Sequence, residues 1–288
     1  MVKQIFSLLR IKDWIKNLFV FLPAFFSGLI LEPNVFKASC IAFLLFSLSA
    51  SLIYIINDYV DRAQDKLHPL KKNRPIASGK ITPKGALIIA GVLALVITIL
   101  GLYSFSLLLL LPLLLYIILN LGYSFGLKHI PILDVSIIAI GFILRVVFGG
   151  LATGIFVSKW AFLLTFFLAL VLALGKRRGE LISISSTSRK VLDGYNKEFL
   201  NTALIICVTI TLVCYVMYTI SDDVIVAFGS DYIYFTTLFV IIALLRYLQL
   251  TFVYNKTESP TKVVYSDLFM QVMIALWLIS FALIIYFK

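Results

Sequence analysis

The sequence predicts an all-α, polytopic membrane protein with nine transmembrane helices and a cytoplasmic N-terminus. Of its 288 residues, 61% are hydrophobic and only 14% are charged, whereas soluble domains are about 45–50% apolar and about 25% charged. The mean hydropathy is +1.05. Apolar runs of about 18 residues or more are long enough to cross a bilayer, and such runs recur along the chain. Cationic residues also gather in alternate connections between the runs.

Nine apolar runs are expected to form these helices. The runs at 36–56 and 265–287 are the clearest, whereas the run at 159–175 is short. Nothing between the runs has the composition of a linker, so residues 1–288 are expected to form a single transmembrane domain. The predicted helices cover residues 17–35, 36–56, 84–103, 105–121, 132–152, 159–175, 199–220, 232–250 and 265–287. The predicted cytoplasmic loops lie at about 57–84, 122–131, 176–198 and 251–264.

The net charge of +11 is explained by membrane topology and does not indicate nucleic-acid binding. Cytoplasmic loops of membrane proteins are enriched in Lys and Arg. When the loops are numbered alternately from an inside N-terminus, 21 of the 25 Lys and Arg residues fall on the inside. The outside ends keep only Lys37, Lys159 and Lys288. This asymmetry supports nine crossings with the N-terminus in the cytoplasm.

The first long polar loop begins with an acidic cluster. On a helix that continues the second span, its side chains fall within an arc of about 100°. Carboxylates this close repel one another unless a cation neutralises them, and oxygen ligands of this kind suit Mg²⁺, which also binds substrate phosphates. The alternative is a solvated helix end whose aspartates pair with Arg62 and Lys66. The predicted metal ligands are Asn57, Asp58, Asp61 and Asp65, and the three aspartates are the predicted catalytic residues.

A cationic segment follows the acidic cluster directly. Lys71, Lys72 and Arg74 lie within four residues, between Pro69 and Pro75. Arg binds phosphate through a planar fork and Lys through a point charge. Metal-binding carboxylates beside phosphate-binding cations predict a diphosphate site, and the alternative is that these cations serve topology alone.

These residues carry a resemblance to a known family. Asn57-Asp58-x-x-Asp61-x-x-x-Asp65 resembles the first aspartate-rich motif of the UbiA superfamily of intramembrane prenyltransferases. The fuller pattern His68-Pro69-x-Lys71-Lys72-x-Arg74-Pro75-Ile76-Ala77 is similar to one branch, the decaprenyl-phosphate phosphoribosyltransferases. Further stretches that resemble this branch are Trp14-Ile15-Lys16-Asn17, Tyr123 to His129, Arg145 with Gly149-Gly150, Gly175-Lys176-Arg177, and Glu258-Ser259-Pro260 with Asp267.

The resemblance implies a fold, a reaction and a location. The fold would be nine transmembrane helices around a central cavity that opens to the cytoplasm, in a bacterial inner membrane. The reaction would use Mg²⁺, with phosphoribosyl pyrophosphate as donor and a membrane polyprenyl phosphate as acceptor. The product would be a polyprenyl-phosphoryl 5-phosphoribose. The sequence does not define the oligomeric state, and a homo-oligomer is one of the possibilities.

The later cytoplasmic loop departs from the usual pattern of the superfamily. Most members show a second aspartate-rich motif there, but this loop opens with Gly175, Lys176, Arg177 and Arg178, and Glu180 is the nearby acid. Three cations favour an additional phosphate-binding patch, because the donor and the lipid acceptor both carry further phosphates. The equally weighted alternative is that cations at the end of a span obey the positive-inside rule and snorkel.

Other candidate substrate-binding residues lie outside the two long loops. Arg145 is the only cation inside a predicted span, and an ionisable residue there usually faces the protein interior. A structural role, in which Arg145 bonds carbonyls between helices, stays equally open. The remaining candidates, which rest on the resemblance, are Lys16, Asn17, His68, Tyr123 and Lys128.

Two other functions compete with phosphoribosyl transfer. One is an aromatic or quinone-type prenyltransferase of the same superfamily, which the missing second acidic motif disfavours. The other is a lipid or solute transporter, whose sites usually lie near the membrane midplane. Here the polar residues concentrate at one membrane face, which favours an enzyme.

Overall fold

The structure is a computed structural model that describes residues 2–67, 71–183, 190–256, 263 and 266–286. All regular secondary structure in these ranges is helical, which confirms the all-α class. Six of the described helices are long and apolar enough to cross a membrane, and two shorter helices are also apolar. The chain is therefore a multi-pass membrane protein, while the count of nine crossings and the N-terminal orientation stay predictions.

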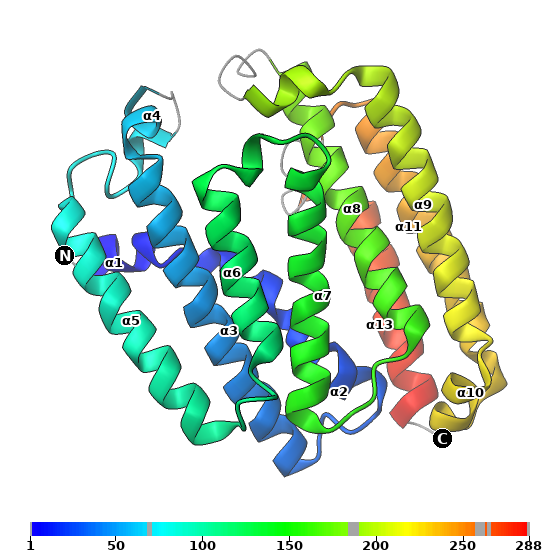
Figure 1. Cartoon of the computed structure of the whole chain (residues 1–288). Helices are drawn as coiled ribbons and strands as arrows, with labels where there is room; N and C mark the ends of the chain where they lie inside the picture. Colours follow the sequence, from blue (N-terminus) through cyan, green and yellow to red (C-terminus); the bar gives the residue numbers. More distant parts are fainter. Residues whose placement is uncertain (1, 68–70, 184–189, 257–262, 264–265, 287–288) are drawn as a thin grey trace. The chain divides into compact units, whose positions relative to one another are not determined.

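The described chain divides into two compact units, and helix α3 (Pro33–Val60) is the centre of the first. It packs against α5 (Pro83–Ser104), α6 (Leu111–Phe125) and the 3-10 helix η1 (Ile11–Phe21), and α3, α5 and α6 run side by side in Figure 1. In the apolar window of α3, 61% of the residues are buried, against 22% in α5. Shorter elements are α1 (Val2–Leu8), α2 (Leu22–Phe26), α4 (Arg62–Leu67), η2 (Lys71–Asn73) and η3 (Leu127–His129).

The second unit is built on two helix pairs. Helix α8 (Lys159–Ile182) packs against α9 (Lys197–Thr219), and α11 (Thr237–Phe252) packs against α13 (Leu268–Tyr286) and α9. Helix α7 (Leu133–Thr153) contributes its first residues to this unit and residues 144–153 to the first unit. The remaining elements are η5 (Lys190–Gly194), α10 (Asp222–Phe228) and η6 (Asp231–Thr236).

Local sequence explains where several of these helices begin. Ser158 and Asn196 precede α8 and α9, and each side chain accepts a hydrogen bond from the backbone N–H three residues later, at 3.1 and 2.7 Å. Thr82 caps α5 in the same way, and Pro83 follows it at the first helical position. Such caps satisfy amides that have no partner within the helix.

The first predicted span, residues 17–35, differs from the structure. Residues 11–21 form a 3-10 helix, and a short α-helix ends at Phe26. Pro23 lacks an amide donor, and Gly28 adopts a positive φ of 74° before Pro33 starts α3. These residues therefore interrupt a segment whose hydropathy alone resembles a continuous helix.

The loop predicted at residues 176–198 begins later than expected. Helix α8 continues from the apolar segment through the Gly-Lys-Arg-Arg-Gly-Glu sequence and ends at Ile182. The helix continues because Arg177 and Arg178 are both buried in the second unit, at 2% and 1% exposure. Their side chains are held by partners on neighbouring elements.

Candidate active site

The acidic cluster lies where α3 passes into α4. Asn57 and Asp58 belong to the last turn of α3, Asp61 follows its end, and Asp65 lies in α4. The amides of Asp61 and Asp65 bond the carbonyls of Asn57 and Asp61, both at 2.9 Å, so helical spacing persists across the junction. Residues four apart share one face of a helix. Asp58 and Asp65 are almost fully buried, so their charges need partners.

Arg74 supplies one partner by bridging two of these carboxylates. A single nitrogen, Nη1, donates to Asp58 Oδ1 at 3.0 Å and to Asp65 Oδ2 at 2.7 Å. The short helix η2 packs on α4, and Ile76 and Ala77, which follow Arg74 closely in the chain, are buried. The guanidinium therefore places positive charge between two buried carboxylates.

Lys128 neutralises the third aspartate from a separate element. It lies in η3, beyond the end of α6, where Gly126 adopts a positive φ of 150°. Its Nζ donates to Asp61 Oδ1 at 2.5 Å and to Asn57 Oδ1 at 3.3 Å. The structure thus brings together six residues that the sequence predicts for the site: Asn57, Asp58, Asp61, Asp65, Arg74 and Lys128.

Arg10 is a site residue that the sequence does not predict. Its Nη2 donates to Asp58 Oδ1 at 2.5 Å, and its guanidinium lies 4.7 Å from the centroid of the Tyr54 ring. Arg10 adopts a left-handed φ of 49° between α1 and η1. The hydroxyl of Ser51 fixes this junction to α3 by donating to the Leu9 carbonyl at 2.8 Å. The contact joins residues 48 positions apart, and in the sequence Arg10 is one of many cytoplasmic cations.

The carboxylates do not pair with their neighbours on the helix. Arg62 donates to the Tyr59 carbonyl at 2.7 Å and lies over the Tyr59 ring. The partners come instead from Arg10, Arg74 and Lys128, so three cations balance three carboxylates. The alternative of a solvated helix end paired along its own surface therefore does not describe this cluster.

The cluster fits a divalent cation in its chemistry. Its candidate ligands are all oxygen atoms, the kind that Mg²⁺ prefers, and Arg74 now pairs with two of the carboxylates. With the cations in place, no group of three or more His, Cys, Asp or Glu side chains within the described ranges is arranged around a metal position.

Asn17 and Arg145 form a second polar cluster in the first unit. Arg145 Nε donates to Asn17 Oδ1 at 2.8 Å, Arg145 Nη2 contacts the Tyr116 hydroxyl at 3.4 Å, and Asn17 Nδ2 donates to the Ser47 hydroxyl at 3.0 Å. Both predicted residues are buried. Gly149, on the same helix as Arg145, lies against the Val20 backbone, where a Cβ would clash with the carbonyl.

The other predicted residues of the first unit come from separate segments and differ in exposure. Lys16 Nζ pairs with Asp13 at 2.7 Å. Lys71 is half-buried and Lys72 is exposed in η2, and Tyr123 is half-buried in the last turn of α6. His68 lies outside the described residues.

Arg177 is engaged in a buried network of the second unit. Its Nε donates to Asp134 Oδ2 and its Nη1 to Glu180 Oε2, both at 2.6 Å. The Tyr195 hydroxyl donates to Asp134 Oδ1 at 2.6 Å and accepts from the Ile132 amide. Burial raises the pKa of Tyr195 well above its usual value, so its hydroxyl stays protonated as a donor. The network fixes the start of α7 to the end of α8.

The other two cations of this segment differ in exposure. Arg178 donates to Asn201 Oδ1 at 2.7 Å, to Asn255 Oδ1 at 2.9 Å and to the Thr251 carbonyl, and so ties α8 to α9 and to the end of α11. Lys176 is 44% exposed and lies 3.9 Å from Glu180. The two arginines therefore bond residues of neighbouring helices, and Lys176 is the most exposed of the three cations.

Replacing Arg177 by Ala is expected to destabilise the protein by about 3–5 kcal/mol, because Asp134 would keep a buried charge without its partner. Thermal unfolding of the detergent-purified protein measures the loss. Lys176→Ala is the control and should leave the melting temperature nearly unchanged. Equal melting temperatures for the two variants would contradict this role of Arg177.

Comparison with known proteins gives the chain a family. The model of the UbiA prenyltransferase family matches residues 20–274. Proteins named decaprenyl-phosphate phosphoribosyltransferase are similar over nearly full length. The one from Mycolicibacterium smegmatis is 32% identical, and the match covers 100% of this chain and 94% of the relative. The one from Corynebacterium glutamicum is also 32% identical, and the match covers 96% of this chain and 85% of the relative.

The fold is also that of solved structures. A UbiA homolog from Archaeoglobus fulgidus, solved with DMAPP and Mg²⁺, superposes with a TM-score of 0.73 at 19% identity, over 97% of this chain and 98% of that chain. The chain is a membrane transferase that belongs to the UbiA prenyltransferase family.

Proposed function

We propose that the protein transfers 5-phosphoribose from phosphoribosyl pyrophosphate to a membrane polyprenyl phosphate of the decaprenyl type, with release of pyrophosphate. The observation that carries the proposal is the similarity, over the full chain, to enzymes named decaprenyl-phosphate phosphoribosyltransferase. The paired acidic and cationic residues of the first unit supply what such a donor needs, because they can hold both a metal and a diphosphate.

Asp58, Asp61 and Asp65, with the Asn57 amide oxygen, are the proposed ligands of Mg²⁺. Solved UbiA homologs that share the fold were determined with Mg²⁺ bound, which supports the choice of metal. A metal ion held there would neutralise negative charge on the leaving diphosphate. The buried positions of Asp58 and Asp65 limit competition from water for their oxygens.

The transfer breaks one bond and forms one. The bond from the anomeric carbon of ribose to the diphosphate oxygen breaks, and the diphosphate leaves with the electron pair. A phosphate oxygen of the lipid attacks the same carbon from the opposite side. Phosphate oxygens are already ionised at neutral pH, so no general base is needed, and positioning and electrostatic stabilisation supply most of the rate.

Arg10, Arg74 and Lys128 are proposed to change partners during this cycle. In the structure they neutralise the carboxylates. In the loaded enzyme, the three cations would instead bind the diphosphate oxygens of the donor. Arginine is suited to this exchange, since its fork binds carboxylate and phosphate alike.

Arg10→Ala is expected to shift metal and donor binding in opposite directions. Without Arg10, Asp58 loses a competing cation, so Mn²⁺ should bind about tenfold more tightly in the absence of donor, while donor binding should weaken about tenfold. Mn²⁺ electron paramagnetic resonance and donor titration measure the two affinities. Lys12→Ala, an exposed cation in η1, is the matched control. Losses in both affinities would show that Arg10 only supports the fold.

The remaining substrate contacts are also proposals, some based on the family resemblance and others on the charges of the two long polar loops. Lys16, Asn17, Tyr123 and Arg145 would contact substrate in the cavity, and His68, Lys71 and Lys72 would assist at the diphosphate. A second phosphate is assigned to Lys176, and Arg177, bound to Asp134 and Glu180, would act there through its field.

The location of the reaction is also proposed. Residues 1–288 would form one UbiA-like domain of nine helices in a bacterial inner membrane, with the acidic cluster facing the cytoplasm. The bias of 21 of 25 cations toward one set of loops supports this orientation. Phosphoribosyl pyrophosphate is a soluble cytoplasmic metabolite, so a cytoplasmic site gives it direct access.

A transfer assay with two donor and acceptor pairs tests the function. Detergent-purified protein with Mg²⁺ receives ribose-labelled phosphoribosyl pyrophosphate and polyprenyl phosphate, or a prenyl diphosphate and an aromatic acceptor. Ribose label in the lipid fraction is the expected result. Turnover of only the prenyl diphosphate would assign the protein to the aromatic prenyltransferases. UbiA homologs solved with GPP and with DMAPP share the fold.

A further inference from the structure

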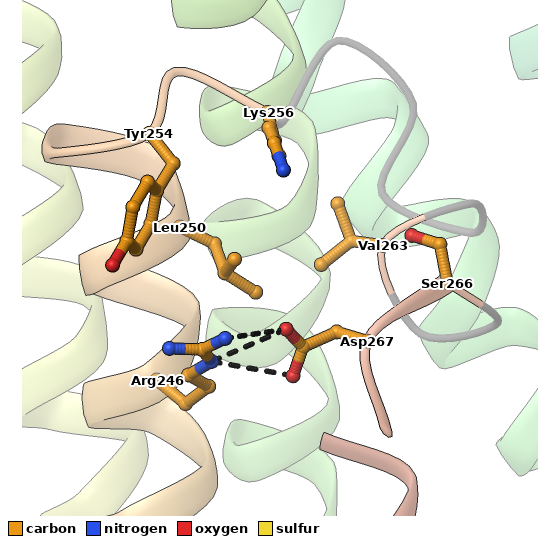
Figure 2. Close-up of a pocket in the computed structure, with 7 residues that line it drawn as sticks. All are labelled: Arg246, Leu250, Tyr254, Lys256, Val263, Ser266 and Asp267. Atoms are coloured by element: carbon orange, nitrogen blue, oxygen red, sulfur yellow. Dashed lines mark hydrogen bonds and ion pairs between the residues drawn. The ribbon is translucent and has the colours of Figure 1, made fainter. Parts of the chain in front are cut away.

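The second unit contains a small polar pocket where the end of α11 faces the start of α13 (Figure 2). Its volume is about 110 Å³, well below the roughly 300–1,000 Å³ of sites that enclose drug-sized ligands. It exceeds the roughly 10–15 Å³ that a cavity needs to hold one water. The space therefore suits a single small ionic group. The lining residues are Arg246, Leu250, Tyr254, Lys256, Val263, Ser266 and Asp267.

The floor of the pocket is an ion pair between Arg246 and Asp267. Arg246 Nη2 donates to Asp267 Oδ2 at 2.7 Å, and Arg246 Nε lies 3.2 Å from Asp267 Oδ1. The hydrogen bond from Arg246 holds the pKa of Asp267 below its usual value, so the carboxylate is charged at neutral pH. Asp267 also caps α13 by accepting from the Met270 amide at 2.9 Å. The pair is neutral overall, and its carboxylate is bonded both to Arg246 and to the start of α13.

Lys256 brings a second cation to the other side of the pocket. In Figure 2 its ammonium points toward the space between Leu250 and Val263, with the Arg246–Asp267 pair beyond them. The backbone is fixed there, because Asn255 adopts a left-handed φ of 52° and the Lys256 amide bonds the Leu250 carbonyl at 3.0 Å. Two cations and one carboxylate leave the lining with one net positive charge.

Apolar surface continues directly from this charged pocket. Leu250 and Val263 are buried in its wall, while Leu268 and Phe269, the next residues after Asp267, are 74% and 46% exposed on α13. An exposed apolar face on a membrane helix is a surface for hydrocarbon chains. Lys and Arg at such a boundary bind anionic lipid headgroups.

We propose that this pocket binds the phosphate group of a membrane lipid, whose hydrocarbon lies along α13. Lys256 is the direct phosphate ligand, the hydroxyl of Ser266 is a secondary donor, and Arg246 adds positive charge while it stays paired with Asp267. The ligand class is a lipid-borne phosphate, carried either by an anionic phospholipid or by a polyprenyl phosphate. The proposal uses residues of the second unit alone and does not depend on which donor the acidic cluster binds.

Lipid binding to the full chain in detergent tests the proposal. Native mass spectrometry measures the occupancy by phosphatidic acid, polyprenyl phosphate and phosphatidylcholine, with and without inorganic phosphate. Lys256→Gln should weaken binding of the phosphate lipids about fivefold. Asp267→Asn removes the competing negative charge but keeps a helix-capping side chain, so it should tighten binding about fivefold. Lys190→Gln, an exposed cation in η5, is the control and should bind like the wild type.

The opposite signs of the two variants separate recognition from damage to the fold. Stronger binding of phosphatidic acid than of polyprenyl phosphate would identify a structural phospholipid, and the reverse order would identify a polyprenyl carrier; both support a lipid phosphate site. Unchanged occupancy in Lys256→Gln and Asp267→Asn would overturn the proposal. So would phosphatidylcholine that binds as tightly as the phosphate lipids, or inorganic phosphate that binds as tightly as either.

Discussion

Replacing Asp61 by Asn is expected to lower the rate of transfer by about 10³-fold or more, while the protein stays folded. Asn keeps the size of the side chain but loses its charge, so the proposed metal loses a carboxylate ligand. Lys128, which lies 2.5 Å from Asp61 Oδ1, also loses its ion-pair partner. Initial rates with polyprenyl phosphate and labelled donor measure the effect, and gel filtration with thermal unfolding reports on the fold.

The matched control is Asp193→Asn, at an exposed aspartate in η5 of the second unit. It makes the same chemical change away from the acidic cluster and should leave the rate nearly unchanged. Turnover by Asp61→Asn close to that of the control would remove Asp61 from the metal site. A loss of folding in Asp61→Asn alone would instead assign it a structural role.

Replacing Arg74 by Lys is expected to lower kcat/KM by about 10²-fold, mainly through KM for the donor. Lysine keeps the charge but lacks the planar fork with which Arg binds carboxylate and phosphate. In the structure, one Arg74 nitrogen bridges Asp58 and Asp65 at 3.0 and 2.7 Å. Steady-state kinetics at varied donor concentration separates KM from kcat.

Arg62→Lys is the control for this substitution. Arg62 lies in the same polar segment but bonds the Tyr59 carbonyl and stacks on the Tyr59 ring. Its kinetics should stay within about twofold of the wild type. If Arg74→Lys were equally mild, the bridging geometry would have no part in donor binding.

Hydropathy predicts the long helices well and the first segment poorly. Residues 36–56 and 199–220 are recovered as α3 and α9, because their apolar runs are long and uninterrupted. Residues 17–35 have similar hydropathy, but Pro23 and Gly28 impose backbone conformations that interrupt the helix. A hydropathy profile measures how favourably the side chains of a segment enter an apolar medium. It contains no information on backbone geometry.

Sequence spacing predicts the acidic cluster because its members are close along the chain. Asn57, Asp58, Asp61 and Asp65 are local neighbours on one helical face, and Arg74 follows in the same loop. Arg10, in contrast, lies 48 positions from Asp58 along the chain. Lys128 lies 67 positions from Asp61 and 71 positions from Asn57. Such contacts depend on how helices pack, so the motif gives no sign of them.

The roles of the cations at the end of α8 also depend on how the helices pack, so the sequence alone does not decide among them. Their spacing is compatible with a phosphate patch, with snorkelling or with ion pairs inside the protein. Only the packing of α7 against this segment shows that Arg177 meets Asp134, a partner 43 positions away. Asp134 itself is fully buried. The sequence shows only a single acidic residue in an apolar run, which does not indicate whether that residue is buried.

The fate of the two halves of the donor tests the central claim most directly. Phosphoribosyl pyrophosphate labelled in the ribose and, separately, in the β-phosphate is incubated with the protein, polyprenyl phosphate and Mg²⁺. We expect the ribose label in the organic phase, an equal amount of β-phosphate label in aqueous pyrophosphate, and loss of both signals with EDTA. Ribose label that stays in the aqueous phase, or β-phosphate label that enters the lipid, would contradict phosphoribosyl transfer by this protein.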